Sequence, residues 1–236
     1  MGYTNSQLVV YKKISPNKTV QRNHKIDTIT IHHMAGNLTV EECGEVFAPK
    51  SRQASSNYGI DSDGRIGLYV EEKDRSWATS SPSNDHRAIT IEVANDNTKT
   101  WTISDKAYKS LVLLCVDICK RNGIAELKWK GDKNLIGNIG QQNMTVHRWF
   151  AATLCPGDYL YNLHSKIAED VNALLKKASP SKLESGNDIV WELMNGKHKI
   201  KIDDASRAIK ALDKAKNNPE FMSLYWIIYK VVNGND

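Results

Sequence analysis

The chain has 236 residues, of which 40% are hydrophobic and 25% charged, and its formal net charge is +5 at pH 7. These values are ordinary for a soluble globular protein and leave room for one domain of typical size and a small second one. No run approaches the ~20 apolar residues that a membrane-spanning helix needs. The positive charge favours polyanionic partners, but no Lys/Arg-rich run of the nucleic-acid-binding kind occurs, so we expect no nucleic-acid ligand.

The N-terminal segment lacks the basic stretch, apolar stretch and small-residue cleavage site of a signal peptide. We therefore expect the chain to fold in a cytosol and to reach any external substrate by another route. The four cysteines do not suggest a disulfide framework. Cys115 and Cys119 share one face of a predicted helix, and Cys43 lies in another amphipathic segment, so these thiols are expected to be free and buried. Cys155 differs, because it lies in a predicted turn.

Strand-like and helix-like patterns alternate over the first ~175 residues. In chain order they predict a strand at 27–33, a helix at 38–47, a hairpin at 57–70, a strand at 86–95, and helices at 104–123 and 155–178. The first helix begins with a capping box, Thr39 and Glu42. Gly64 belongs to the predicted hairpin turn, and Gly123 ends the second helix. The alternation predicts an α/β fold over residues 1–178, with a mixed central β-sheet flanked by helices.

The composition changes after residue 178. Residues 179–187 contain Ser, Pro and Gly without periodicity and predict a linker. Residues 188–236 carry three short helical patterns and predict a small C-terminal all-helical domain. A unit of under ~60 residues without disulfides is marginally stable alone, so we expect it to dimerise or to dock on a partner. The alternative is that its aromatic and aliphatic residues only form its own core.

Two predicted strands carry polar groups on a defined face. Alternate residues of a strand share a face, so His32 lies with Thr28 and Thr30, whereas His33 lies with the isoleucines. If the isoleucines face the covering helices, His32 faces the more polar side. The same alternation places Glu92 on the polar face of the later strand. The alternatives are a surface histidine and a solvent-facing glutamate.

A third segment brings a second histidine and a cysteine close together. His147 and Cys155 are eight residues apart, and Pro156 and Gly157 fix a turn at the thiol. Zinc suits imidazole and thiolate ligands, and a catalytic zinc site keeps three protein ligands and an open fourth position. Two ligands from this loop and one from a distant strand would build such a site.

Five motifs together resemble the N-acetylmuramoyl-L-alanine amidase family, which includes phage endolysins and peptidoglycan recognition proteins. They are ITIHH, SSNYGIDSDGRI, AITIEV, VHRWF and TLCPGDY, and their order and spacing agree with the family over roughly residues 25–175. The resemblance implies a zinc ion, Zn²⁺, held by His32, His147 and Cys155. The strand-facing argument selects His32 over His33 independently.

The resemblance also implies the residues around the metal. Glu92 is expected to act as the general base, and Thr153 stands where part of the family has a lysine, as a hydrogen-bond donor to the developing oxyanion. Ser56 stands where many members have a catalytic tyrosine. We further predict substrate contacts at His86, within the predicted loop 76–88, and at Tyr58; the alternatives are an exposed loop histidine and a core aromatic residue.

The implied function is hydrolysis of the amide bond between N-acetylmuramic acid and L-alanine in bacterial peptidoglycan. We expect a phage or prophage endolysin that stays in the host cytoplasm until it is released to the cell wall. Residues 188–236 would then bind a secondary wall polymer or form a homodimer. The alternatives are a peptidoglycan-binding module without turnover and a cytosolic amidase that recycles wall fragments.

Overall fold

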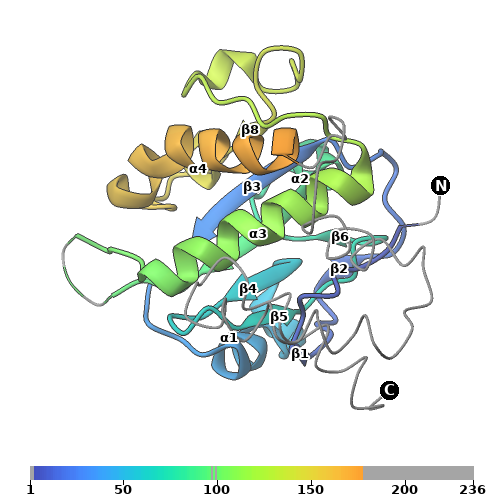
Figure 1. The fold of residues 1–236 in the computed structure, drawn as a ribbon. Helices are drawn as coiled ribbons and strands as arrows, with labels where there is room; N and C mark the ends of the chain where they lie inside the picture. Colours follow the sequence, from blue (N-terminus) through green and yellow to red (C-terminus); the bar gives the residue numbers. More distant parts are fainter. Residues whose placement is uncertain (1–2, 97, 99, 178–236) are drawn as a thin grey trace, which may run out of the picture. The chain divides into compact units, whose positions relative to one another are not determined.

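The computed structural model describes residues 3–96, 98 and 100–177 of the chain (Figure 1). The predicted linker 179–187 and helical domain 188–236 lie outside the described residues, and the domain boundaries stay predictions. The described strands are β1 Tyr11–Lys12, β2 Lys18–Thr19, β3 Thr28–His33, β4 Tyr58–Ile60, β5 Ile66–Leu68, β6 Arg75–Ser76, β7 Ala88–Val93 and β8 Met144–Thr145.

The helices fall between and after these strands. They are α1 Val40–Phe47, α2 Pro82–Arg87, α3 Asp105–Asn122 and α4 Asp158–Lys177, with short 3-10 turns η1 Lys50–Arg52, η2 Lys133–Leu135 and η3 His147–Trp149. Among the residues that the structure describes, no helix combines the length and apolar character required to cross a membrane.

One six-stranded sheet organises the fold, with the strand order β1-β5-β4-β7-β3-β8. β4, β7, β3 and β8 are parallel neighbours, whereas β5 runs antiparallel to β4, so the sheet is mixed as predicted. A separate two-stranded sheet pairs β2 with β6. The central strands β3 and β7 pair residue by residue, which places His32 beside Glu92. Because parallel strands end at the same edge, the carboxyl ends of four strands meet there.

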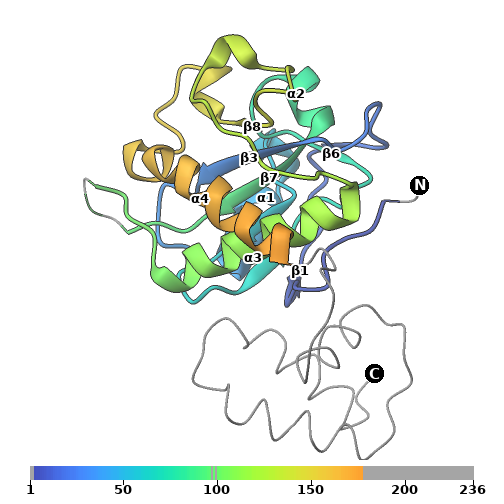
Figure 2. The ribbon, with the colours of Figure 1, turned by 45° about the horizontal axis from the view of Figure 1, so that its top comes forward.

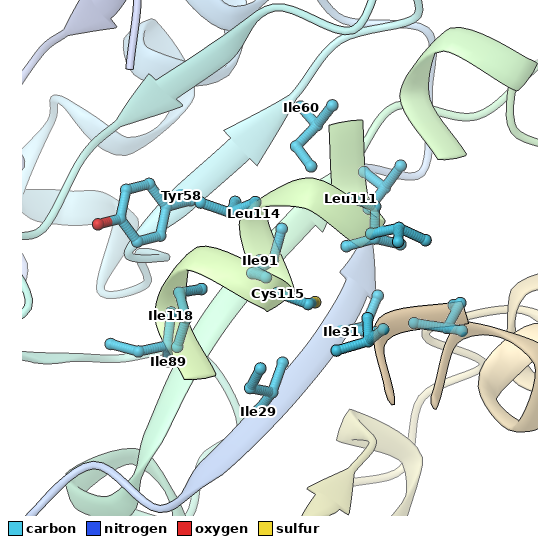
Figure 3. Packing of buried hydrophobic residues seen from close by; sticks show 14 of the residues in the cluster. Ile29, Ile31, Tyr58, Ile60, Ile89, Ile91, Leu111, Leu114, Cys115 and Ile118 are labelled. Carbon is cyan, nitrogen blue, oxygen red and sulfur yellow. The ribbon is translucent and has the colours of Figure 1, made fainter. Parts of the chain in front are cut away.

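The apolar face of this sheet forms the main hydrophobic core. Alternate residues of β3 and β7, among them Ile29, Ile31 and Ile91, are 0% exposed. They pack against Leu111 and Ile118 of α3 (Figure 3). α3 and α4 lie side by side over this face (Figures 1 and 2). Burying one such aliphatic side chain contributes about 1.5–3 kcal/mol, so the isoleucine pattern fixes which face of β3 turns inward.

The opposite face is buried too, but it is polar at its centre. Thr30 and Thr145 share a hydrogen bond of 2.7 Å between their hydroxyl oxygens. The side-chain amide of Asn84 donates to Thr30 and its oxygen accepts from Thr145. Asn84 belongs to α2, a helix within the segment 76–88 that we predict to be a loop. That prediction is wrong for residues 82–87, because Ser81 caps a helix that has proline at its first turn.

Several local signals in the sequence are confirmed. Thr39 and Glu42 form both hydrogen bonds of the capping box at the start of α1. Gly64 (φ 81°) and Gly123 (φ 69°) have the left-handed backbone expected at the hairpin turn and at the end of α3. The four cysteines are free and buried.

Candidate metal centre

Three metal-ligating side chains converge at the carboxyl edge of the sheet. They are His32 near the end of β3, His147 at the start of η3, and Cys155 in the turn before α4. Their ligand atoms all lie within 4.8 Å of one another. Cys155 Sγ is 3.4 Å from His32 Nδ1, and the two imidazole centroids are 5.1 Å apart.

The strand order explains why these distant residues meet. β8 runs parallel to β3 and ends at the same edge, so the next turn delivers His147 beside His32. The backbone N–H of Arg148 then donates to the carbonyl of Cys155 at 3.0 Å, which ties the histidine turn to the cysteine turn. The hydroxyl of Thr153 accepts a hydrogen bond of 3.2 Å from the N–H of Cys155. The backbone therefore presents the thiol toward the sheet edge.

Burial sets the protonation of the three residues. His32 is 1% exposed, and desolvation holds its pKa well below the usual value, with the nearby His147 acting in the same direction. Desolvation also lowers the pKa of His147, against a smaller opposing effect of Asp85. Both imidazoles are therefore neutral at pH 7 and offer lone pairs. Burial raises the pKa of the Cys155 thiol, so binding of a metal there would release its proton.

The donor set and its spacing fit zinc. Two nitrogens and one sulfur match the ligand preference of zinc, whereas magnesium and calcium prefer oxygen ligands. Tetrahedral zinc with its usual bond lengths separates a nitrogen from a sulfur ligand by roughly 3.6 Å. The distance between Cys155 Sγ and His32 Nδ1 is 3.4 Å, so both atoms can bind one ion without a large backbone movement.

Glu92 adds a carboxylate beside this cluster. Its Oε1 is 3.8 Å from His32 Nδ1, and its side chain is 15% exposed. Because His32 is neutral, this contact is not an ion pair. Burial raises the pKa of Glu92 to about 8. Its Oε2 is buried and has no hydrogen-bond partner among the described residues, so one carboxylate oxygen is free to exchange a proton.

Two of the predicted substrate contacts lie elsewhere. Tyr58 is 0% exposed, and its hydroxyl donates to Glu72 and accepts from the N–H of Ser6. Its side chain lies in the core, as in the alternative that we considered, and it offers no exposed surface to a substrate. His86 lies in α2 and accepts a hydrogen bond from the N–H of Asn23. No hydrogen bond among the described residues links it to the three-residue cluster.

Ser56 is also unavailable for chemistry. Its side chain is 0% exposed, and its hydroxyl bonds the carbonyls of Tyr58 and Thr90. The position where many relatives of the family carry a tyrosine is therefore structural in this chain. Among the described residues, Glu92 places a carboxylate oxygen 3.8 Å from His32 Nδ1.

Two aromatic residues near the site escaped the sequence analysis. Trp101 packs against His33, with the two ring centroids 4.7 Å apart and the rings tilted. His164 of α4 is 0% exposed, lies 4.5 Å from the Trp129 ring, and desolvation lowers its pKa to about 4. The helical periodicity that buries Leu160 and Ile167 also buries His164, so this signal was present in the sequence. No comparable signal marks Trp101, which lies between predicted elements.

Comparisons with known proteins identify the family and the fold of this chain. The family model described as N-acetylmuramoyl-L-alanine amidase matches residues 22–158. A comparison with curated proteins found no match. Among solved structures, a mutant of PlyL is 15% identical, with a TM-score of 0.51, and the alignment covers 70% of this chain and 98% of that one.

Two further solved structures have similar folds. A mutant endolysin from Bacillus subtilis is 16% identical, with a TM-score of 0.50 and coverage of 68% of this chain and 97% of that one. A selenomethionine derivative of AmpD is 16% identical, with a TM-score of 0.51 and coverage of 71% and 99%. At these identities the structural similarity supports the fold alone. The family model, in contrast, matches more than half of the sequence. The chain belongs to the N-acetylmuramoyl-L-alanine amidase family.

Proposed function

We propose that this chain is a zinc-dependent hydrolase of the amide bond between N-acetylmuramic acid and L-alanine in peptidoglycan. The zinc ion would be held by His32, His147 and Cys155. The observation that carries the proposal is the convergence of these three donor atoms within 4.8 Å in a chain of this amidase family. When bound there, zinc would supply Lewis-acid polarisation of the amide carbonyl and acidify a water molecule.

Glu92 is the residue that we expect to move the proton. Its unpartnered Oε2 can take a proton from the attacking water and give it to the amide nitrogen as the carbon–nitrogen bond breaks. A pKa of about 8 in the metal-free protein would fall when a divalent cation binds nearby. The carboxylate would then be ionised at neutral pH and could act as a base.

Thr153 contributes mainly by orienting Cys155. Its hydroxyl oxygen accepts the N–H of Cys155, which leaves the hydroxyl hydrogen free to donate. We propose that it donates to the carbonyl oxygen of the substrate as negative charge develops. A neutral donor cannot cancel that charge as a lysine would.

The central experiment measures the metal and the product together. The purified chain should contain one zinc per molecule and release L-alanine amino termini from cell walls, and a chelator should abolish this release. Cys155→Ser should lose the zinc and the activity, because one of three ligands is gone. The matched control is Cys119→Ser, which alters another buried thiol on α3 and should leave the metal in place. Full zinc content in Cys155→Ser would contradict the ligand set.

We further propose that the amidase acts on intact walls as a phage or prophage endolysin, with residues 188–236 as a wall-binding or dimerising unit. One of the structures with a similar fold is described as an endolysin. Turnover on intact sacculi should exceed turnover on soluble muropeptides. The opposite preference would favour an amidase that recycles fragments, and wall binding without amine release would indicate a non-catalytic module.

A further inference from the structure

Trp101 has an unusual backbone for a bulky residue. It lies between β7 and α3, and its φ of 49° falls in the left-handed region, which residues other than glycine, asparagine and aspartate rarely adopt. Residues in such conformations persist only where their surroundings hold them, and they cluster at functional sites. The contacts of Trp101 therefore indicate which part of the structure depends on this conformation.

Backbone hydrogen bonds hold Trp101 in a turn. The N–H of Asp96 donates to the carbonyl of Thr102 at 2.8 Å, and the N–H of Trp101 donates to the carbonyl of Thr98 at 3.3 Å. The Asp96 carboxylate accepts from the hydroxyls of Thr98 and Thr102. These bonds fix the turn that presents the indole ring.

The indole ring contacts two segments that carry proposed metal ligands. It packs against His33, the neighbour of His32, with the two rings tilted by 34° to each other. It also approaches Gly157, two residues after Cys155. A Cβ at Gly157 would lie 3.0 Å from Trp101 Cε3, so the ring and this backbone are in close contact.

The same two segments are joined directly at the sulfur. Cys155 Sγ lies 3.4 Å from Nδ1 of His32, the residue before His33 on β3. Trp101 thus packs over the junction at which the end of β3 meets the cysteine turn. Loss of the ring would remove packing from both sides of this junction.

We propose that Trp101 is a positioning residue for the metal centre. Its ring holds the turn of Cys155 against the end of β3, so that Sγ stays at bonding distance from an ion that His32 also binds. This role rests on the proposed zinc site. Residues that orient metal ligands typically change metal affinity by 10–100-fold when they are altered.

The test compares zinc affinity between the wild-type full chain and its variants. Trp101→Asn removes the ring but tolerates the left-handed backbone, so its effect reports on the ring and not on strain. We expect it to weaken zinc binding by about 10–100-fold in competition with a chromogenic chelator. Trp101→Phe retains a ring against His33 and Gly157 and should recover most of the affinity.

A spectroscopic signature separates positioning from general packing. Co²⁺ bound in place of zinc should show altered ligand-field and sulfur-to-metal absorption in Trp101→Asn, and near-normal absorption in Trp101→Phe. Tyr108→Phe, on α3, is the control and should change neither quantity. Unchanged zinc affinity and an unchanged Co²⁺ spectrum in Trp101→Asn would overturn the positioning role alone. A wild-type chain that binds no zinc would overturn the proposed site and this role together.

Discussion

At the scale of single residues, Glu92 lies next to the three candidate metal ligands and has a carboxylate oxygen without a hydrogen-bond partner among the described residues. We predict that Glu92→Gln keeps its zinc and loses turnover by about 10²–10⁴-fold, the usual contribution of one general acid–base group. The amide preserves the shape of the side chain but cannot accept the proton. Metal analysis and amine release from walls measure the two quantities separately.

The matched control for this variant is Glu126→Gln, which alters a carboxylate whose side chain is 50% exposed and pairs with Lys128. It should retain full turnover. A Glu92→Gln variant that hydrolyses walls at the normal rate would remove the general-base role from Glu92 while leaving the metal ligands untouched.

Asp74 is a buried carboxylate, outside the candidate metal centre, whose charge stabilises the fold. Its side chain is 1% exposed and pairs with Lys18 and Lys73. Burial alone would raise its pKa, but a hydrogen bond from the N–H of Gln21 and the two lysines together lower it to about 2. The depressed pKa means that the folded state binds this proton less readily than the unfolded state does.

The resulting stability is present above the unfolded pKa of about 3.9 and is lost as the pH falls toward about 2. We predict that Asp74→Asn lowers the free energy of unfolding by about 1–2 kcal/mol at pH 7, and by less at pH 3. Urea denaturation at the two pH values measures this. Asp63→Asn, at a side chain that is 73% exposed, should show no such pH-dependent loss.

At the scale of elements, α3 is stabilised mainly by its apolar face against the sheet. Ile118 is 0% exposed and belongs to the core formed with Ile89 and Ile91 (Figure 3). We predict that Ile118→Ala lowers the free energy of unfolding by about 2–5 kcal/mol, because it leaves a cavity in a closely packed region.

Denaturant titration of the purified variant checks this value. The control is Lys109→Ala on the exposed side of the same helix, which should change stability by less than about 0.5 kcal/mol. A loss for Ile118→Ala as small as that for Lys109→Ala would mean that the contact of α3 with the sheet contributes little to stability.

At the scale of the whole molecule, the family match ends at residue 158 and the described fold at residue 177. We predict that residues 1–178 alone bind zinc and hydrolyse soluble muropeptides, because all proposed site residues lie within them. Without residues 179–236 the protein should adsorb less to intact walls, since the second unit no longer raises the local concentration at the substrate.

Co-sedimentation with purified walls, measured beside turnover on soluble substrate, tests whether the two regions have these separate roles. Full adsorption by residues 1–178 would mean that the region 188–236 does not bind the wall. Loss of zinc from the shortened chain would instead show that the catalytic unit extends beyond residue 178.

The sequence by itself determined the central strands and the face of the sheet on which His32 and Glu92 lie. In β3 and β7 the isoleucines alternate with polar residues, and burial of the apolar face leaves His32 and Glu92 on the other. The capping box of α1 and the glycine that ends α3 are local hydrogen-bonding and backbone effects, so they too were readable from neighbouring residues. The spacing of His147 and Cys155, together with the motifs of the family, added these two residues as candidate ligands.

Only the tertiary structure decided the rest, because it depends on contacts between residues far apart in the chain. β8 has two residues and no periodicity, and it exists through its pairing with β3. Tyr58 became a core residue because the buried carboxylate of Glu72 accepts its hydroxyl hydrogen. Trp101 gained its place over the cysteine turn from the close approach of Gly157. The alternation of a strand determines the face on which a side chain lies. Long-range packing determines which residues that side chain contacts.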